Sequence, residues 1–589
     1  MVRLFRRDLG ARVRSIKPKR LGCFLTGPEC LEERLVMDYG ISFVGDTLTI
    51  TSSTGDVSDL SIGYGFGSLV LTENGSSAGS FVGVGLPAGV TVLNPNQLQI
   101  TDAFFSNVNR SVTIDLADGA DLATITGIAG TRPNVTINMG IGADTLVGST
   151  QADVFNILGN ESVGIAGLVF QDVETVNAGT QPANEADRVV GRAAADLFVL
   201  NGANSVTSLG VRFNEIELVD GAGGSDTVQG TTGNDVITLV APTAGFPSST
   251  NVFAGSILFG NMESIDGGGG VDNLGGVDSG AGSDETINLT PTDGVFTVAG
   301  LSVSGITRFD ARGGNDRIVG TTASDEFQMV EPNSLTAKGV IFSGIETVDA
   351  GTGSDTVFGI PLTDDTFLLT GSKIGRTLGV QFEQFERYNA RTGAVNLSLD
   401  PALAGTTTLD FTGLTSTPNS VRIRDILFEI VREIDTNGQP VQQTGLTSIR
   451  VADLDPTAAD DFQPIANDIV LREVTTINID TVVGTTGNDV FLLTGNGTLS
   501  FRGINYTSVK EFDGAGGRDQ VNVSPGGSVI DITFRSTDPN NFLHNLVGTG
   551  IDVRNIEVVN PDSKDVRLIS PQTVAASPVS GQQLTANGI

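Results

Sequence analysis

The chain has 589 residues, with 34 Lys and Arg against 68 Asp and Glu, so its formal net charge at pH 7 is −34. A surface this acidic repels phosphates and anionic lipid headgroups, which excludes nucleic acid as a partner and favours divalent cations. Trp is absent, and both Cys lie within the first 40 residues, so the body has neither a disulfide framework nor a thiolate metal site. No apolar run reaches the length of about 18 residues that a membrane-spanning helix needs, so no transmembrane segment is expected.

Residues 1–40 form a basic leader, with nine Lys and Arg against five Asp and Glu. Its first half is similar in charge to the start of an export signal, but the apolar stretch that normally follows is missing. The segment 31–36, LEERLV, resembles the L-E-P-R-x-L-L motif at the N-terminus of large extracellular proteins of planctomycete bacteria, with Glu33 in place of the proline. This resemblance implies an extracellular or cell-surface location. A basic tail without a targeting role is the alternative.

Residues 41–110 alternate apolar and polar side chains in short stretches, such as 47–51 and 90–93, separated by Gly and Ser. This pattern predicts short β-strands. No repeat is visible there. We expect a β-rich N-terminal cap, because the open end of a solenoid would expose unpaired strand edges.

Residues 111–393 carry a repeat of about 39 residues, which the acidic positions mark. From Asp196 the chain runs 21 residues to Glu217 and nine more to Asp226. A further step of nine reaches Asp235. One such unit cannot bury its own apolar face and must stack on its neighbours. The repeat therefore predicts an all-β fold, a parallel β-solenoid with two coils per unit, of 18 and 21 residues.

The period breaks at 394–480, where we expect an irregular β insertion. One further copy of the repeat lies at 481–525, and 526–589 is predicted to form a C-terminal β segment with a flexible tail. A β-propeller of about seven blades is the alternative architecture. Strands of three or four residues between turns are too short for its blades, which favours the solenoid.

The turns themselves carry a second resemblance. Residues 221–238, GAGGSDTVQ followed by GTTGNDVIT, resemble the nonapeptide G-G-x-G-x-D-x-U-x of the haemolysin-type (RTX) calcium-binding repeats. The resemblance implies Ca²⁺ as a bound ion, held between turns that stack on consecutive coils of one edge. Its candidate ligands here are Asp144, Asp226, Asp235, Asp284, Asp316, Asp355, Asp489 and Asp519.

Two observations bear on that implication. Only two nonapeptides adjoin before 21 residues intervene, so an acidic turn is expected to stack on turns that lack aspartate. Asp and Gly also persist in turns for structural reasons alone, which is the alternative to an ion site.

A glutamate recurs once per unit, and we expect these residues in one row, about 10 Å apart. Thr307 and Lys510 occupy the same position, which argues against a metal or catalytic role and favours a solvated face. The glutamates are Glu174, Glu217, Glu263, Glu346 and Glu386.

A catalytic site is not expected. Polysaccharide-active β-helices need paired carboxylates in a cleft together with a basic partner, whereas His544 stands alone and only four Lys follow residue 40. We expect a secreted or cell-surface structural protein, an acidic rod or matrix component stabilised by calcium, with cell-surface or matrix components as partners. The alternatives are an adhesin or interaction module that uses 394–480, and a polysaccharide-active enzyme.

Overall fold

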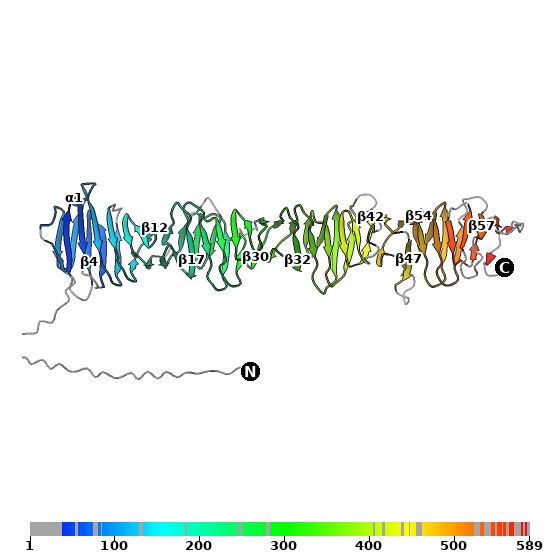
Figure 1. Cartoon of the computed structure of the whole chain (residues 1–589), viewed down its shortest axis with the longest axis horizontal. Helices are drawn as coiled ribbons and strands as arrows, with labels where there is room; N and C mark the ends of the chain where they lie inside the picture. The colour runs from blue at the N-terminus through cyan, green and yellow to red at the C-terminus, as the bar shows by residue number, and fades with distance from the viewer. Residues whose placement is uncertain are drawn as a thin grey trace, which may run out of the picture.

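In the computed structural model the chain forms a long rod that consists almost entirely of β-strands (Figure 1). About 11 turns of a parallel β-solenoid stack along its axis, which confirms the predicted fold and excludes the propeller. The described residues are 38–585 without 53–56, 75–79, 84, 129–133, 183–184, 244–245, 247–249, 278–282, 404–406, 415–418, 438–440, 447, 455–461, 524–529, 535–542, 548–550, 557, 561–564, 570–578 and 581–583. The LEERLV segment and most of the leader lie outside them, as does much of the expected C-terminal tail. No helix in the described part is long and apolar enough to cross a membrane.

Two sheets form the walls of the rod, and the chain passes from one to the other at each turn. We call them sheet A, which contains β16 (Arg188–Val190), and sheet B, which contains β15 (Thr175–Asn177). Along each strand the side chains alternate between the interior and the outer surface. In β12 (Val154–Gly159), for example, Phe155 and Ile157 are buried between the sheets.

Each 39-residue unit contributes five strands. In one unit, β17 (Leu197–Gly202), β18 (Ser205–Ser208) and β19 (Val211–Asn214) form an antiparallel meander within sheet B. The chain then crosses to sheet A for β20 (Leu218–Asp220) and back to sheet B for β21 (Thr227–Gln229). The 21-residue part of the repeat is therefore a folded-back meander and not a coil of its own.

The next meander lies in the opposite sheet. It consists of β22 (Val236–Val240), β23 (Asn251–Ala254) and β24 (Ile257–Gly260), all in sheet A. Within each unit the chain crosses between the two sheets an odd number of times, so the next unit starts in the opposite sheet. The structure therefore repeats only after two units of sequence. The expectation of two whole coils per unit is wrong for this reason.

The turn between the second and third strands of each meander requires an unusual backbone. Leu209 and Gly210 have φ of 47° and 83°, and Lys338 and Gly339 have φ of 49° and 79°. Two consecutive positive φ values define the tight hairpin turn that matches the twist of antiparallel strands. Glycine at the second position is the local signal for this hairpin.

Aromatic rings from both sheets meet in the core. Phe296 of β28 (Phe296–Val298) in sheet B packs edge-on against Phe309 and Phe342 of sheet A, with ring centroids 5.6 and 5.4 Å apart. All three side chains are buried. Such pairs add to the free energy of burial that holds stacked units together.

At the N-terminal end both sheets finish in antiparallel hairpins. β1 (Asp38–Val44) pairs with β2 (Thr47–Thr51), which runs parallel to β8 (Ser111–Asp115) of the first coil. In sheet B, β3 (Asp59–Gly65) and β4 (Ser68–Glu73) pair in the same antiparallel way. This is the β-rich cap that the alternating pattern predicts.

The segment 394–480 continues both sheets. β41 (Val395–Leu399) pairs with β37 (Asp365–Gly371) on one side and with β45 (Val431–Asp435) on the other. β46 (Val441–Thr444) and β50 (Thr476–Asn478) extend sheet A in the same order. The sequence period breaks here, but the sheets do not.

Candidate functional site

The acidic residues of the repeat lie where the chain crosses between the sheets. We call the crossings from sheet A to sheet B the first edge, and those from sheet B to sheet A the second edge. At the first edge the main-chain N–H of Asp196 donates to Oδ1 of Asp226, 2.8 Å away. The N–H of Asp226 in turn donates to Oε2 of Glu263, also at 2.8 Å. We call such a series of acidic residues, joined by hydrogen bonds from one coil to the next, a carboxylate ladder. Each acidic residue in it is a rung, and this ladder has three.

The same ladder recurs along the rod and alternates between the edges, as the meanders do. Every link is a hydrogen bond of 2.7 to 2.9 Å from a main-chain N–H to a carboxylate oxygen of the next coil. Besides Asp196–Asp226–Glu263, the ladders among the described residues are Asp121–Asp144–Glu174, Asp153–Asp187–Glu217, Asp235–Asp272, Glu285–Asp316–Glu346, Asp325–Asp355–Glu386 and Asp489–Asp519.

Two expectations from the sequence are wrong. Acidic turns do stack on acidic turns, because turns 30 to 37 residues apart, and not neighbouring nonapeptides, meet at one edge. The glutamates do not form a single solvated row. Those at the first edge and those at the second edge alternate, and each accepts a main-chain N–H of the preceding coil.

Asp284 is the one predicted ligand that lies off the ladders. Its side chain is exposed, and its Oδ1 accepts the N–H of Asn315. The neighbouring Glu285 is buried and takes the rung, with its N–H 2.7 Å from Oδ1 of Asp316. The other seven predicted aspartates are rungs, but they are distributed over six ladders and both edges.

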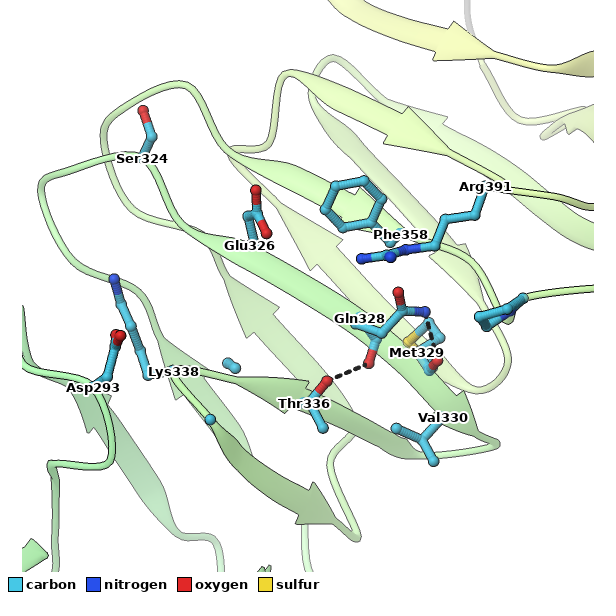
Figure 2. A pocket seen from close by; sticks show the side chains of 13 residues that line it. Asp293, Ser324, Glu326, Gln328, Met329, Val330, Thr336, Lys338, Phe358 and Arg391 are labelled. Atoms are coloured by element: carbon cyan, nitrogen blue, oxygen red, sulfur yellow. Dashed lines mark hydrogen bonds between the residues drawn. The ribbon is translucent and has the colours of Figure 1, made fainter. Parts of the chain in front are cut away.

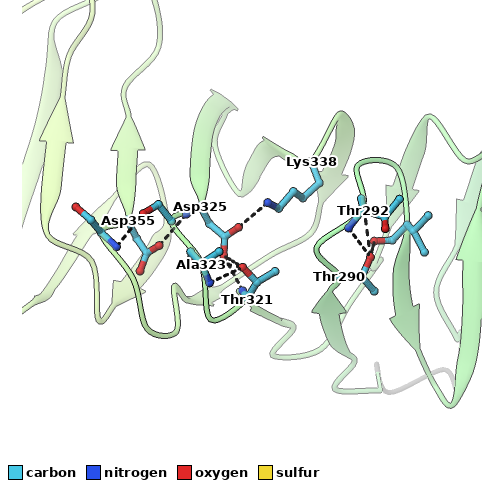
Figure 3. Close-up of polar contacts among 10 residues, drawn as sticks. Thr290, Thr292, Thr321, Ala323, Asp325, Lys338 and Asp355 are labelled. Atoms are coloured by element: carbon cyan, nitrogen blue, oxygen red, sulfur yellow. Dashed lines mark hydrogen bonds and ion pairs between the residues drawn. The ribbon is translucent and has the colours of Figure 1, made fainter.

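The first rung of a ladder closes its own turn. Oδ2 of Asp325 accepts the N–H of Thr321 at 2.6 Å and its hydroxyl at 2.9 Å (Figure 3). Oδ1 of the same aspartate forms an ion pair with Nζ of Lys338 at 2.8 Å. Arg502 pairs with Asp489 in the same way, at 3.2 Å. In these ladders a side chain of the protein already supplies the positive charge.

The middle rung leaves one oxygen without a partner. Asp226 is fully buried, and its Oδ2 meets no hydrogen-bond donor among the described residues. This oxygen lies over Gly221, where an added Cβ would be 2.6 Å from it and 2.3 Å from the carbonyl oxygen of Asn261. Glycine is not required there in every ladder, because Ala311 and Ala350 stand five residues before the middle rungs Asp316 and Asp355. The same unpartnered oxygen occurs at Asp144, Asp187, Asp272, Asp316 and Asp355.

Burial makes these carboxyl groups hold a proton at unusually high pH. Loss of hydration, together with the nearby Glu263 and Asp196, raises the pKa of Asp226 to about 6. The same causes, burial first and then Asp153 and Glu217, raise the pKa of Asp187 to about 7. A protonated carboxyl group carries a donor as well as an acceptor. The middle rungs can therefore act as neutral carboxylic acids.

The ladders are interrupted in the segment 394–480. At the first edge the N–H of Asp365 donates to the carbonyl oxygen of Ala394 at 2.8 Å, and the N–H of Val395 donates to that of Ile430 at 2.9 Å. Main-chain carbonyls replace carboxylates as acceptors there. The coils remain stacked while the acidic signature of the sequence is lost.

The residues of the ladders do not fit a calcium ion. Calcium is bound by about six to eight oxygen atoms, whereas here Oδ1 of each middle rung accepts an N–H, and an N–H repels a cation. In the described part of the chain, no three His, Cys, Asp or Glu side chains are grouped as metal ligands would be.

Seven rungs are neither candidate ligands nor members of the predicted glutamate row, and Asp121 and Glu285 are two of them. Asp153, Asp187, Asp196, Asp272 and Asp325 follow the same spacing as the predicted residues, but most of their turns have lost a glycine. The signal that identifies them is distance along the chain, because an aspartate about 30 residues before another rung stacks on it. The number of glycines in the turn is a weaker guide.

In comparisons with known proteins, no protein-family model matches the chain, and no curated protein matches it significantly.

Proposed function

We propose that this protein is a structural rod, a spacer or matrix component at the cell surface or outside the cell. The observation that carries the proposal is the uninterrupted pair of sheets. Among the described residues sheet A has 31 strands, and at about 4.8 Å per strand the rod is about 150 Å long. Stacking of this kind makes an object that is stiff and extended, which is what a spacer needs.

The ladders support the same role. They join consecutive coils at both edges of the rod through hydrogen bonds from main-chain amides to carboxyl groups. Their carboxyl groups are bonded to main-chain amides, and most are buried, so they are not available to a substrate. We therefore propose a scaffold and no catalytic activity.

The proposal is tested by shape and location together. Negative-stain electron microscopy of the purified full chain should show single straight rods about 150 Å long. On intact producing cells, an antibody against the solenoid should label the outer surface, and added protease should remove that label. Compact particles, or label that appears only after the cells are broken, would refute the proposal.

We further propose that the rod is stable without metal. Millimolar calcium at pH 7 should change the melting temperature, followed by circular dichroism, by less than about 2 °C relative to a chelator. An ion present at 100 times its dissociation constant would add about 2.7 kcal/mol of stability, which such a scan detects easily. A rise of several degrees with calcium would show that the ladders rearrange around an ion.

A further inference from the structure

A groove of about 850 Å³ crosses the outer face of sheet A in the middle of the rod (Figure 2). Its floor is formed by β32 (Glu326–Glu331), β33 (Ser334–Ala337) and β36 (Thr356–Phe358). Arg391, Phe358 and Gln328 lie together at one end, and Lys338 and Asp293 lie at the other.

The repeat does not account for the residues of this groove. Phe358 stands three residues after the middle rung Asp355, a position whose side chain faces outward. The equivalent residues of four other units are small, aliphatic or polar: Val190, Gln229, Gly275 and Val319. Coil stacking requires the inward Val357 but places no demand on an outward aromatic ring. A departure of this kind from the repeat calls for another explanation.

Arg391 is held in place but has no counter-ion. Its Cζ lies 4.2 Å from the centre of the Phe358 ring, so the guanidinium is stacked on that ring. No carboxylate in the described part of the chain forms an ion pair with it, whereas the nearby Arg387 pairs with Glu429. A guanidinium fixed by stacking keeps its planar row of N–H donors for a ligand, and carboxylates match that row in a bidentate way.

Gln328 lies beside this arginine, and its amide is held by the main chain. Its Nε2 donates to the carbonyl oxygens of Met329 and Gly359, which fixes the orientation of the amide. Its Oε1 is then buried and meets no donor among the described residues. Because Oε1 is enclosed by the protein, the amide is a fixed part of the groove beside Arg391 and not a contact for a ligand.

We propose that this groove binds a saccharide that carries one carboxylate per sugar, a uronic acid. The carboxylate would pair with Arg391, and hydroxyl groups of the sugar would donate to Glu326 on the floor of the groove. Lys338 is already paired with Asp325, and Asp293 and Glu326 lie nearby, so a doubly charged phosphate or sulfate is disfavoured. This binding goes beyond the scaffold role, and the rod would stand without it.

The chain contains a matched control for the test. Arg312 occupies the position of Arg391 two units earlier, but it lies against Gly275, where an added Cβ would be 2.8 Å from its Nη2, and not against an aromatic ring. Arg312→Ala therefore removes the same charge from the same face of the rod without touching the groove. Arg391→Lys keeps the charge and removes the planar row of donors.

Isothermal titration calorimetry of the full chain with a short oligogalacturonate, in about 150 mM salt, should give saturable binding. Arg391→Ala should weaken it at least tenfold, Arg391→Lys by less, and Arg312→Ala by less than twofold. The methyl ester of the same oligosaccharide should not bind. Circular dichroism would confirm that each variant is folded. Phe358→Leu removes the ring on which Arg391 is stacked; it is expected to weaken binding several-fold and serves as a second test of the groove.

Absence of saturable binding to the unmodified chain would overturn the proposal, as would equal losses from Arg391→Ala and Arg312→Ala. Binding of the ester as strong as that of the acid would overturn the assignment of the carboxylate to Arg391. Each of these outcomes leaves the rod and its location untouched, because those are measured by microscopy and by surface labelling.

Discussion

The melting temperature of the rod should be about 5–10 °C higher at pH 5 than at pH 8. The reason lies in the buried rungs, whose carboxyl groups lose hydration and face other acids. Burial, before any neighbouring charge, raises the pKa to about 6 or about 7 in Asp121, Asp187, Asp226, Asp316 and Asp355.

The direction of this pH dependence follows from the protons that the folded rod retains and the unfolded chain releases. In the unfolded chain these carboxyl groups have a pKa of about 3.9, so between pH 4 and 6 the folded rod holds protons that the unfolded chain has released. Stability from these groups is complete below the unfolded pKa and is lost as pH rises through the folded values of about 6 and 7. Each retained proton changes the free energy of unfolding by about 1.4 kcal/mol per pH unit in that range.

Thermal scans by circular dichroism at half-unit steps from pH 5 to pH 8 measure this dependence. Asp187→Asn keeps an acceptor for the N–H of Asp153 but cannot titrate, so it should flatten the pH profile. Repulsion among surface charges acts in the same direction, and repeating the scans in about 1 M salt, where the Debye length is about 3 Å, removes it. A melting temperature that rises with pH, or a profile unchanged in Asp187→Asn, would contradict the assignment.

Asp226→Ala should lower the free energy of unfolding of the surrounding coils by about 1–3 kcal/mol, because it leaves the buried N–H of Asp196 without an acceptor. The damage should be local, since each coil contacts only its neighbours. Hydrogen exchange followed by mass spectrometry should show at least tenfold faster exchange in peptides from β16 to β21, and little change in β52 (Val490–Gly495).

Asp226→Asn is the matched comparison. The amide keeps the acceptor for the N–H of Asp196, and it cannot ionise. This variant should equal the unmodified chain at pH 5 and exceed it in stability at pH 8, where the wild-type carboxyl group is ionised and buried. Equal destabilisation by Ala and Asn would mean that the negative charge itself is needed, as it would be for a bound cation.

The positions of the rungs cannot be predicted from a local motif alone. Asp284 and Glu285 are adjacent acids, and the nonapeptide pattern favours Asp284. The pairing of β27 (Thr286–Leu289) with β31 (Arg317–Val319) places Ile287 beside Ile318 in the core, which puts Glu285 on the rung. Register between coils is set by apolar side chains some 30 residues away, and a local motif does not contain that information.

The groove, like the choice of rung, depends on pairing between strands that are far apart in the sequence. Phe358 and Arg391 are 33 residues apart, and neither is unusual by itself. They meet because β36 pairs with β40 (Arg387–Asn389), with Phe358 opposite Asn389, so that the following turn places the guanidinium over the ring.

The sequence by itself determined the period, the all-β class and the inward apolar face, because all three are repeated local patterns that stacking must satisfy. The tertiary structure alone decided that the 21-residue part folds back as a meander within one sheet. From that follow the odd number of crossings per unit and the alternation of meanders, ladders and glutamates between the two edges. A short strand can pair with the strand that follows it in the sequence, as in a meander, or with a strand of a neighbouring coil. Contacts far along the chain decide between the two, because the alternation of polar and apolar residues is the same in both cases.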